Sequence, residues 1–204
     1  MLKDQPKEKK MVAYSYEKLI NSISFFSAEH TKLTQKPLYK TTLLKYLSLF
    51  YYKVFSTLGE PPLELSFVAM ENGPVAEEVY VGINENIFNV AEFEIIKNMG
   101  MDNLEKTQII GKSYNLDFFS DFEVEVMRDL ITKYATSYKN NNEIIDATHE
   151  LRPWKIAWEN RGNGKMKKMN DEDIFEEVSQ DNLANEHYLI YKTLRETSIA
   201  NFSR

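Results

Sequence analysis

The distribution of apolar and polar positions along the chain predicts a mostly helical protein. The segment from Tyr14 to about His30 is the first to show this pattern. Its apolar residues recur at three- and four-residue spacing: Leu19, Ile20, Ile23 and Phe26. Because this spacing places side chains on one face of a helix, we expect one amphipathic helix here.

The stretch Thr41–Leu58 is apolar on nearly every side. Helices of that kind are normally surrounded by other elements, so we expect this one to be the central core helix. Gly59 is suited to end it, and Pro61 and Pro62 prevent its continuation. The next segment, Glu64–Met70, ends in β-favourable residues and predicts a short strand.

A sharp turn is expected at Asn72–Pro74, where Gly73 tolerates unusual backbone dihedrals. We expect Pro74 to be the first residue of a new helix, a position that proline favours. Glu77 and Glu78 then fall in the first turns of that helix, where acidic groups complement the helix dipole.

Two β-prone runs, Glu92–Met99 and Lys106–Lys112, flank the turn-like segment Gly100–Asn103 and predict a hairpin. Farther on, Ser120 and Glu123 form a capping-box pattern that opens the clearest helix of the chain. Its expected buried stripe has a four-residue spacing: Phe122, Val126, Leu130 and Tyr134. Off this stripe lie the charged residues Glu123, Glu125, Arg128, Asp129 and Lys133.

The last third of the chain predicts several short elements. We expect a polar break at Tyr138–Asn142, a short helix near Glu143–Ala147, and a further helical turn within Thr148–Trp158. Arg161–Lys168 is basic, contains glycine and is expected to be an exposed loop. The two expected final helices are Asp171–Val178 and Asn182–Ala200.

These elements predict a mainly α (α+β) fold, a compact helical domain around a central apolar helix with a small β element or hairpin. We expect a flexible tail over residues 1–13, a helical domain over 14–160, and a basic loop with C-terminal helices packed on it over 161–204. With 204 residues, one ordinary domain with an appended element accommodates the whole chain.

Composition and charge narrow the class of protein. Apolar residues make up 43% of the chain, enough for a real core, and the net charge of −6 argues weakly against nucleic-acid binding. Cysteine is absent, which excludes disulfides and thiolate metal sites. The charged N-terminal residues contain no secretory signal, and no apolar run is as long as a membrane span, so we expect a cytoplasmic protein.

No motif of catalysis or cofactor binding is present: there is no P-loop, dinucleotide fingerprint, zincin motif or nucleophile elbow. The three histidines, His30, His149 and His187, have no metal-ligand spacing, so we expect neither a metal nor a cofactor. An enzyme that uses His149 with Glu150, Glu77 or Glu78 is a minor hypothesis, because neighbouring glutamates on a helix are usually a solvated face.

Two aromatic residues stand four positions apart near the end of the predicted domain. Trp154 and Trp158 share one helical face, and we interpret them first as core anchors. The alternative is a hot spot for a protein partner, an environment in which tryptophan is enriched. We interpret His149 first as a helix-start or core hydrogen-bonding residue and second as a partner contact.

Four pieces of the chain, in order over about Tyr14–Glu159, resemble the Panacea domain of SocA-like antitoxins, also known as phage-associated proteins. The first is the apolar, tyrosine-rich helix Leu43–Phe55. The second combines an aromatic/Ala segment with a Gly-Pro-Val turn and a Val-Tyr helix: Phe67, Ala69, Gly73, Pro74, Val75, Val79 and Tyr80. The third is a capped helix: Phe119, Ser120, Glu123 and Tyr134. The fourth is a Thr-His…Pro-Trp motif: Thr148, His149, Pro153 and Trp154, with Ala157 after it.

Some positions depart from the family pattern. Asn72 occupies a position where histidine or tyrosine is common, and the first helix lacks the usual Lys-Leu-Gln-Lys-Leu-Leu-Tyr type run. Such differences leave the identity of the partner open.

The resemblance implies a non-catalytic, type II antitoxin-like protein, phage or mobile-element encoded, that neutralises a cognate toxin by binding it. An acidic antitoxin would often meet a basic toxin surface. The residues expected to bind the partner or set the motif are Asn72, Gly73, Pro74, Val75, Glu78, Tyr80, His149, Trp154 and Trp158. The alternatives are an accessory or adaptor protein with a non-toxin partner and, less favoured, a nucleic-acid contact through Lys165–Lys168.

Overall fold

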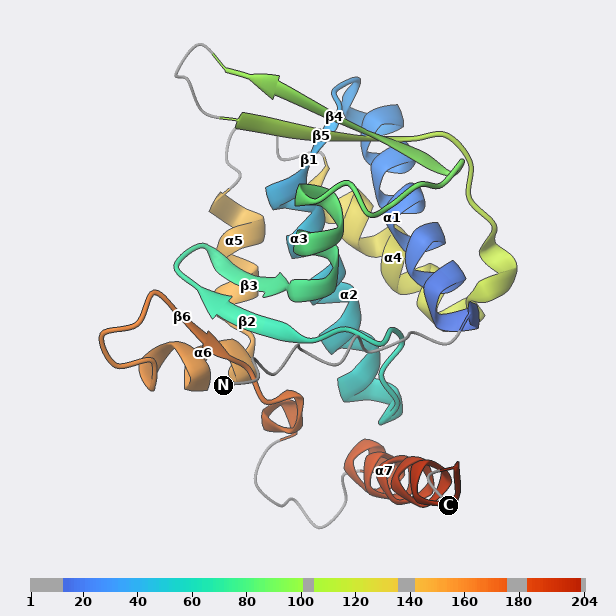
Figure 1. The fold of residues 1–204 in the computed structure, drawn as a ribbon, viewed down its shortest axis with the longest axis vertical. Helices are drawn as coiled ribbons and strands as arrows, with labels where there is room; N and C mark the ends of the chain where they lie inside the picture. Colours follow the sequence, from blue (N-terminus) through green and yellow to red (C-terminus); the bar gives the residue numbers. More distant parts are fainter. Residues whose placement is uncertain (1–12, 101–104, 136–141, 176–182, 203–204) are drawn as a thin grey trace, which may run out of the picture.

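The computed structural model describes residues 13–100, 105–135, 142–175 and 183–202 and has an α+β architecture (Figure 1). Its α-helices are α1 Ala13–Thr34, α2 Lys40–Leu58, α3 Glu77–Asn84, α4 Asp121–Tyr134, α5 Asn142–His149, α6 Arg152–Glu159 and α7 Leu183–Phe202. Its strands are β1 Leu38–Tyr39, β2 Phe67–Met70, β3 Gly73–Ala76, β4 Phe93–Met99, β5 Glu105–Gly111 and β6 Met166–Lys168. Two short 3-10 segments are η1 Leu116–Phe118 and η2 Asp171–Ile174. The predicted mainly helical α+β fold is therefore confirmed. Most of the hairpin turn, most of the polar break and residues 1–12 of the predicted tail lie outside the described residues, and Ala13, the last residue of that tail, begins α1.

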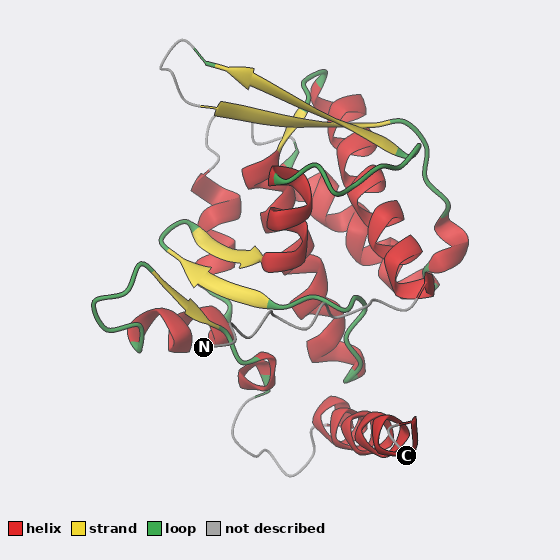
Figure 2. Cartoon of the chain, in the orientation of Figure 1, coloured by secondary structure: helices red, strands yellow, loops and turns green. Residues whose placement is uncertain are grey.

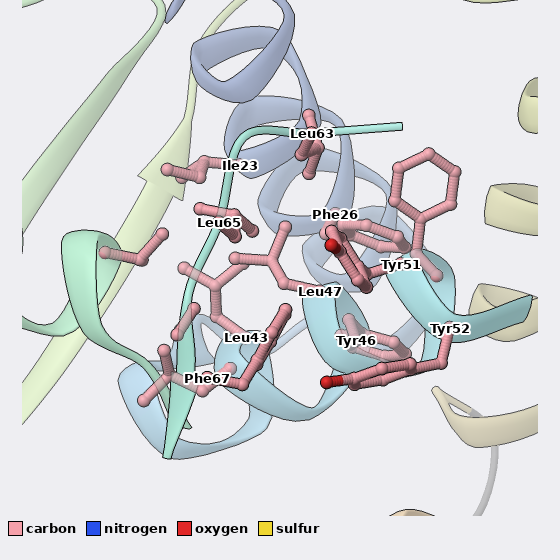
Figure 3. Close-up of a cluster of buried hydrophobic side chains, with 14 of the residues drawn as sticks. Ile23, Phe26, Leu43, Tyr46, Leu47, Tyr51, Tyr52, Leu63, Leu65 and Phe67 are labelled. Atoms are coloured by element: carbon pink, nitrogen blue, oxygen red, sulfur yellow. The ribbon is translucent and has the colours of Figure 1, made fainter. Parts of the chain in front are cut away.

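Helix α2 is the centre of the core, as its apolar pattern predicts (Figure 1). Most of its side chains are buried, and Tyr46 stacks on Phe26 of α1 with a ring-centroid distance of 5.1 Å. Figure 3 shows side chains of α1, α2 and the Leu63–Phe67 segment converging there. The helix ends at Gly59, whose φ of +74° is the left-handed conformation that glycine adopts without a Cβ penalty.

Two small antiparallel sheets lie beside the helices (Figure 2). One has the order β1-β5-β4 and contains the predicted hairpin, with Ile95 opposite Ile109. The other has the order β3-β2-β6, with Val68 opposite both Val75 and Lys168.

The prediction that Pro74 begins a helix is wrong. Pro74 lies in β3 opposite Ala69, and α3 begins at Glu77. The strand is possible because β3 is at the edge of its sheet, where the missing N–H of proline leaves no partner unsatisfied. Glu77 and Glu78 do fall in the first turn of α3, as predicted.

The predicted buried stripe of α4 is displaced. Glu123, expected off the stripe, is only 5% exposed, and Met127 and Ile131 are buried on the same side. The Glu123 carboxylate accepts a hydrogen bond from the Ser120 N–H, which completes the predicted capping box, and pairs with Lys18 of α1 at 2.7 Å. These two partners make the burial of this carboxylate possible.

The C-terminal third also differs from its prediction in two places. The basic loop is exposed as expected, but its last three residues form β6, whose backbone groups complete the free edge of β2. Asp171–Ile174 is a short 3-10 turn, where an α-helix was expected, and the Asp171 carboxylate accepts hydrogen bonds from Tyr51 and Tyr52 of α2. Helix α7 forms close to its predicted bounds. Among the helices that the structure describes, none combines the length and apolar character of a membrane span.

Candidate functional site

A cavity of about 740 Å³ opens beside the first half of α2. Its walls come from α2, the turn between β2 and β3, α3, α5, and the segment from Trp158 to Lys165. Apolar side chains such as Leu44, Val75 and Ile144 supply much of the surface. The volume is within the range of sites that enclose a small molecule or a few inserted side chains.

Lys45 lines this cavity from within the core helix and is only 4% exposed. Its ammonium donates a hydrogen bond to the backbone carbonyl of Pro74 at 3.0 Å. Burial lowers the pKa of this lysine to about 8, because a low-dielectric environment disfavours the charged form. Sequence reasoning missed this residue. The only signal was its position in a largely apolar helix, and this does not separate it from Lys53 of the same helix, which is exposed.

Gly73 brings the turn close to the buried lysine. Its φ of +95° confirms that the turn needs a residue without a Cβ. A Cβ at this position would lie 2.4 Å from the Thr148 hydroxyl oxygen and 3.1 Å from the Lys45 ammonium nitrogen. The glycine therefore permits both the turn and the close approach of α2, β3 and α5.

A continuous stack of rings stands beside the cavity. His149 stacks on Trp154 with centroids 4.0 Å apart, and Trp154 stacks on Trp158 with centroids 5.6 Å apart. The guanidinium of Arg161 lies 3.7 Å from the centroid of the Trp158 ring, close enough for a cation–π interaction. The two tryptophans differ in role: Trp154 is buried and donates its indole N–H to the Met70 carbonyl, whereas half-buried Trp158 lines the cavity.

His149 is half-buried, and burial is the main cause that lowers its pKa, opposed by a backbone hydrogen bond with Glu71. Its Nε2 atom is buried and has no hydrogen-bond partner among the described residues. Two of the three carboxylates proposed to work with His149 bind other groups, and the third, Glu77, is exposed. Glu150 pairs with Lys155 at 2.6 Å, and Glu78 accepts the backbone N–H of Ser66 at 2.9 Å. The structure thus does not bring the suggested catalytic pair together.

The charges that line the cavity have the opposite sign to the chain as a whole. Of the charged lining residues that the structure describes, four are cationic and one is anionic: Lys40, Lys45, Arg161 and Lys165 against Glu71. Lys40 is partly engaged, since its ammonium binds the Asn84 side chain at 2.6 Å and lies 5.0 Å from the Tyr80 ring centroid. A local positive surplus on a protein of net charge −6 was not foreseen from composition.

Most of the residues that sequence reasoning singled out gather at this cavity. The lining includes Asn72, Gly73, Val75, Tyr80 and Trp158. Three others are connected to the lining without being part of it. The Pro74 carbonyl accepts the hydrogen bond of Lys45, and His149 and Trp154 form the ring stack that continues to Trp158. Glu78 is the exception, because it binds backbone at Ser66. In the part of the chain that the structure describes, no three acidic or histidine side chains are grouped as a metal would require.

Comparison with known families places most of this site in one domain. A family model described as "Antitoxin SocA-like, Panacea domain" matches residues 43–155, more than half of the chain. The match includes Lys45, the Gly73 turn, His149 and Trp154, while Trp158, Arg161, Lys165 and α7 follow it. No curated protein and no solved structure matches the chain.

Proposed function

The chain belongs to the SocA-like Panacea antitoxin domain family, and from this premise we propose that it neutralises a cognate toxin by binding it directly. The observation that carries the proposal is the family match over residues 43–155. A scaffold that neutralises by binding needs only a binding face.

We assign the toxin contact to the mouth of the cavity, where the family's motif residues gather. Tyr80 is 41% exposed, and Trp158 and Arg161 line the same cavity. Tyrosine, tryptophan and arginine are the residue types that carry most binding energy at protein interfaces, because each combines a large contact area with a polar group. Tyr80 and Trp158 lie on helices α3 and α6, so the backbone that carries them is already ordered before binding.

The experiment is co-expression with the product of the adjacent gene, with growth and complex formation as the two readouts. If that product is a toxin, the wild-type chain should restore growth and co-purify with it. Tyr80→Ala and Trp158→Ala should each weaken the complex by roughly tenfold or more. Tyr14→Ala is the matched control, since Tyr14 is 56% exposed on α1 and does not line the cavity.

Two outcomes would contradict the proposal at different levels. Failure of every adjacent gene product to bind or to be neutralised would refute the antitoxin function of this chain. A partner that binds without being toxic would indicate an adaptor. Equal effects of Tyr80→Ala and Tyr14→Ala would refute only the assigned face.

A further inference from the structure

We propose that the cavity beside α2 is also a binding site for a small organic anion, whose phosphate or carboxylate group contacts the Lys45 ammonium. This inference does not depend on the toxin proposal. It concerns a ligand small enough to enter the 740 Å³ cavity.

The first reason is an uncompensated charge. Lys45 is 96% buried, and no described carboxylate forms an ion pair with it. An ammonium carries three donors, and the Pro74 carbonyl accepts one of them. Buried charges in proteins are normally paired, because removing an ion from water is costly unless an opposite charge replaces the solvent. An anionic group in the cavity would provide that opposite charge.

The second reason is a second polar atom that lacks a partner. The Nε2 atom of His149 is buried and has no hydrogen bond among the described residues. The charge of Lys45 also acts on the His149 ring and helps lower its pKa, so the two groups belong to one electrostatic environment. In the neutral ring a free Nε2 is an acceptor. An anion beside Lys45 would offset the ammonium charge and favour the protonated ring, in which Nε2–H is a donor.

The third reason is the shape and polarity of the site. Arg161 and Lys165 add cationic groups to the cavity wall, and Glu71, the one carboxylate among the described lining residues, is on an exposed residue. Leu44, Val75 and Ile144 provide apolar surface for the body of a ligand. Ligand sites typically combine apolar walls with a few polar groups that fix the orientation, and this cavity has that composition.

The test is thermal melting of the full chain at pH 7 with adenosine monophosphate, with citrate and with inorganic phosphate as anionic probes. Adenosine is the uncharged counterpart, and sodium chloride at matched ionic strength controls for screening. A ligand that binds the folded state raises the melting temperature in a saturable way. We expect at least one anionic probe to do so in the wild-type chain, and adenosine to have no comparable effect.

Lys45→Met removes the charge while preserving most of the volume, and it should weaken the apparent affinity by roughly tenfold or more. Lys53→Met makes the same chemical change at an exposed position of the same helix and should behave as wild type. Lys165→Gln changes an exposed residue of the cavity wall and provides a second test if Lys45→Met does not fold.

Two results would overturn the inference: no anionic probe stabilises the wild-type chain beyond the chloride control, or Lys45→Met and Lys165→Gln both respond as strongly as wild type. Because no toxin is used, a negative result here leaves the antitoxin proposal intact. Competition between the stabilising probe and the co-purified partner would show whether both use the same face.

Discussion

Replacing Lys45 by methionine removes a charge that folding transfers from water into the core. The pKa of Lys45 is lowered from 10.5 to about 8 by burial. Each unit of pKa difference between folded and unfolded states corresponds to about 1.4 kcal/mol, so the buried charge costs roughly 3 kcal/mol at neutral pH. We therefore expect Lys45→Met to unfold at higher urea concentration than wild type at pH 7.

The dependence on pH gives a sharper test of the same reasoning. Below pH 8 the lysine is protonated in both states, and the full cost is present. Between pH 8 and 10.5 the unfolded chain binds more protons than the folded chain, so wild-type stability rises with pH. The advantage of Lys45→Met should shrink by about 2 kcal/mol between about pH 7.5 and about pH 9.5.

Urea unfolding in chloride buffers, without phosphate, measures this difference at each pH. Burial raises the pKa of Tyr46 and Tyr188 in the folded state, so tyrosine ionisation in the unfolded state adds its own pH dependence near the upper end of this window. That contribution is the same in both chains and cancels in the difference between them. Lys53→Met is the control and should show a constant offset from wild type. A stability gap between Lys45→Met and wild type that does not change with pH would refute the assignment of a depressed pKa to Lys45.

Three further predictions concern the turn, the capping box and the first helix. Gly73→Ala should cost about 3 kcal/mol in urea unfolding, because its Cβ would combine a positive φ with a clash. Gly162 also has a positive φ but lies in open space, so Gly162→Ala should cost about 1 kcal/mol. Equal costs for the two variants would contradict this reasoning. Glu123→Ala should cost about 3 kcal/mol in urea unfolding, because it leaves the Lys18 ammonium, whose side chain is 13% exposed, without its partner. Adding Lys18→Met should recover part of that loss. Burial lowers the pKa of His30 to about 4, so between pH 6.5 and 4 the unfolded state binds more protons than the folded state. The free energy of unfolding should therefore fall as the pH is lowered through this range, and His30→Gln should make the fall smaller. A pH profile that His30→Gln leaves unchanged would refute the lowered pKa of His30.

Much of the fold could be predicted because its signals are local. The apolar run Thr41–Leu58, the β-prone pair around Gly100 and the Ser120–Glu123 capping box each depend on residues close in sequence, and all three form as expected. The Gly73 turn was also predicted correctly, since a positive φ strongly favours glycine.

Other elements were decided by pairing across the chain. Pro74 has the local preference of a first helical residue, but pairing with β2 placed it in an edge strand. Glu123 was expected to be solvated, and the Lys18 ammonium from α1, 105 positions away, allowed it to be buried. The strand β6 was expected to be loop, because three exposed residues carry no apolar alternation to reveal it.

The sequence by itself therefore determined the helical class, the central helix and the family motifs, since these depend on the spacing of residues along a short stretch. Only the tertiary structure decided that Lys45, the Gly73 turn, Trp158 and Arg161 form one cavity with a positive surplus. The physical reason is that burial and electrostatic environment depend on side chains that are distant in sequence. Net charge averages over the whole chain, whereas a bound ligand responds to the few groups that lie within several ångströms of it.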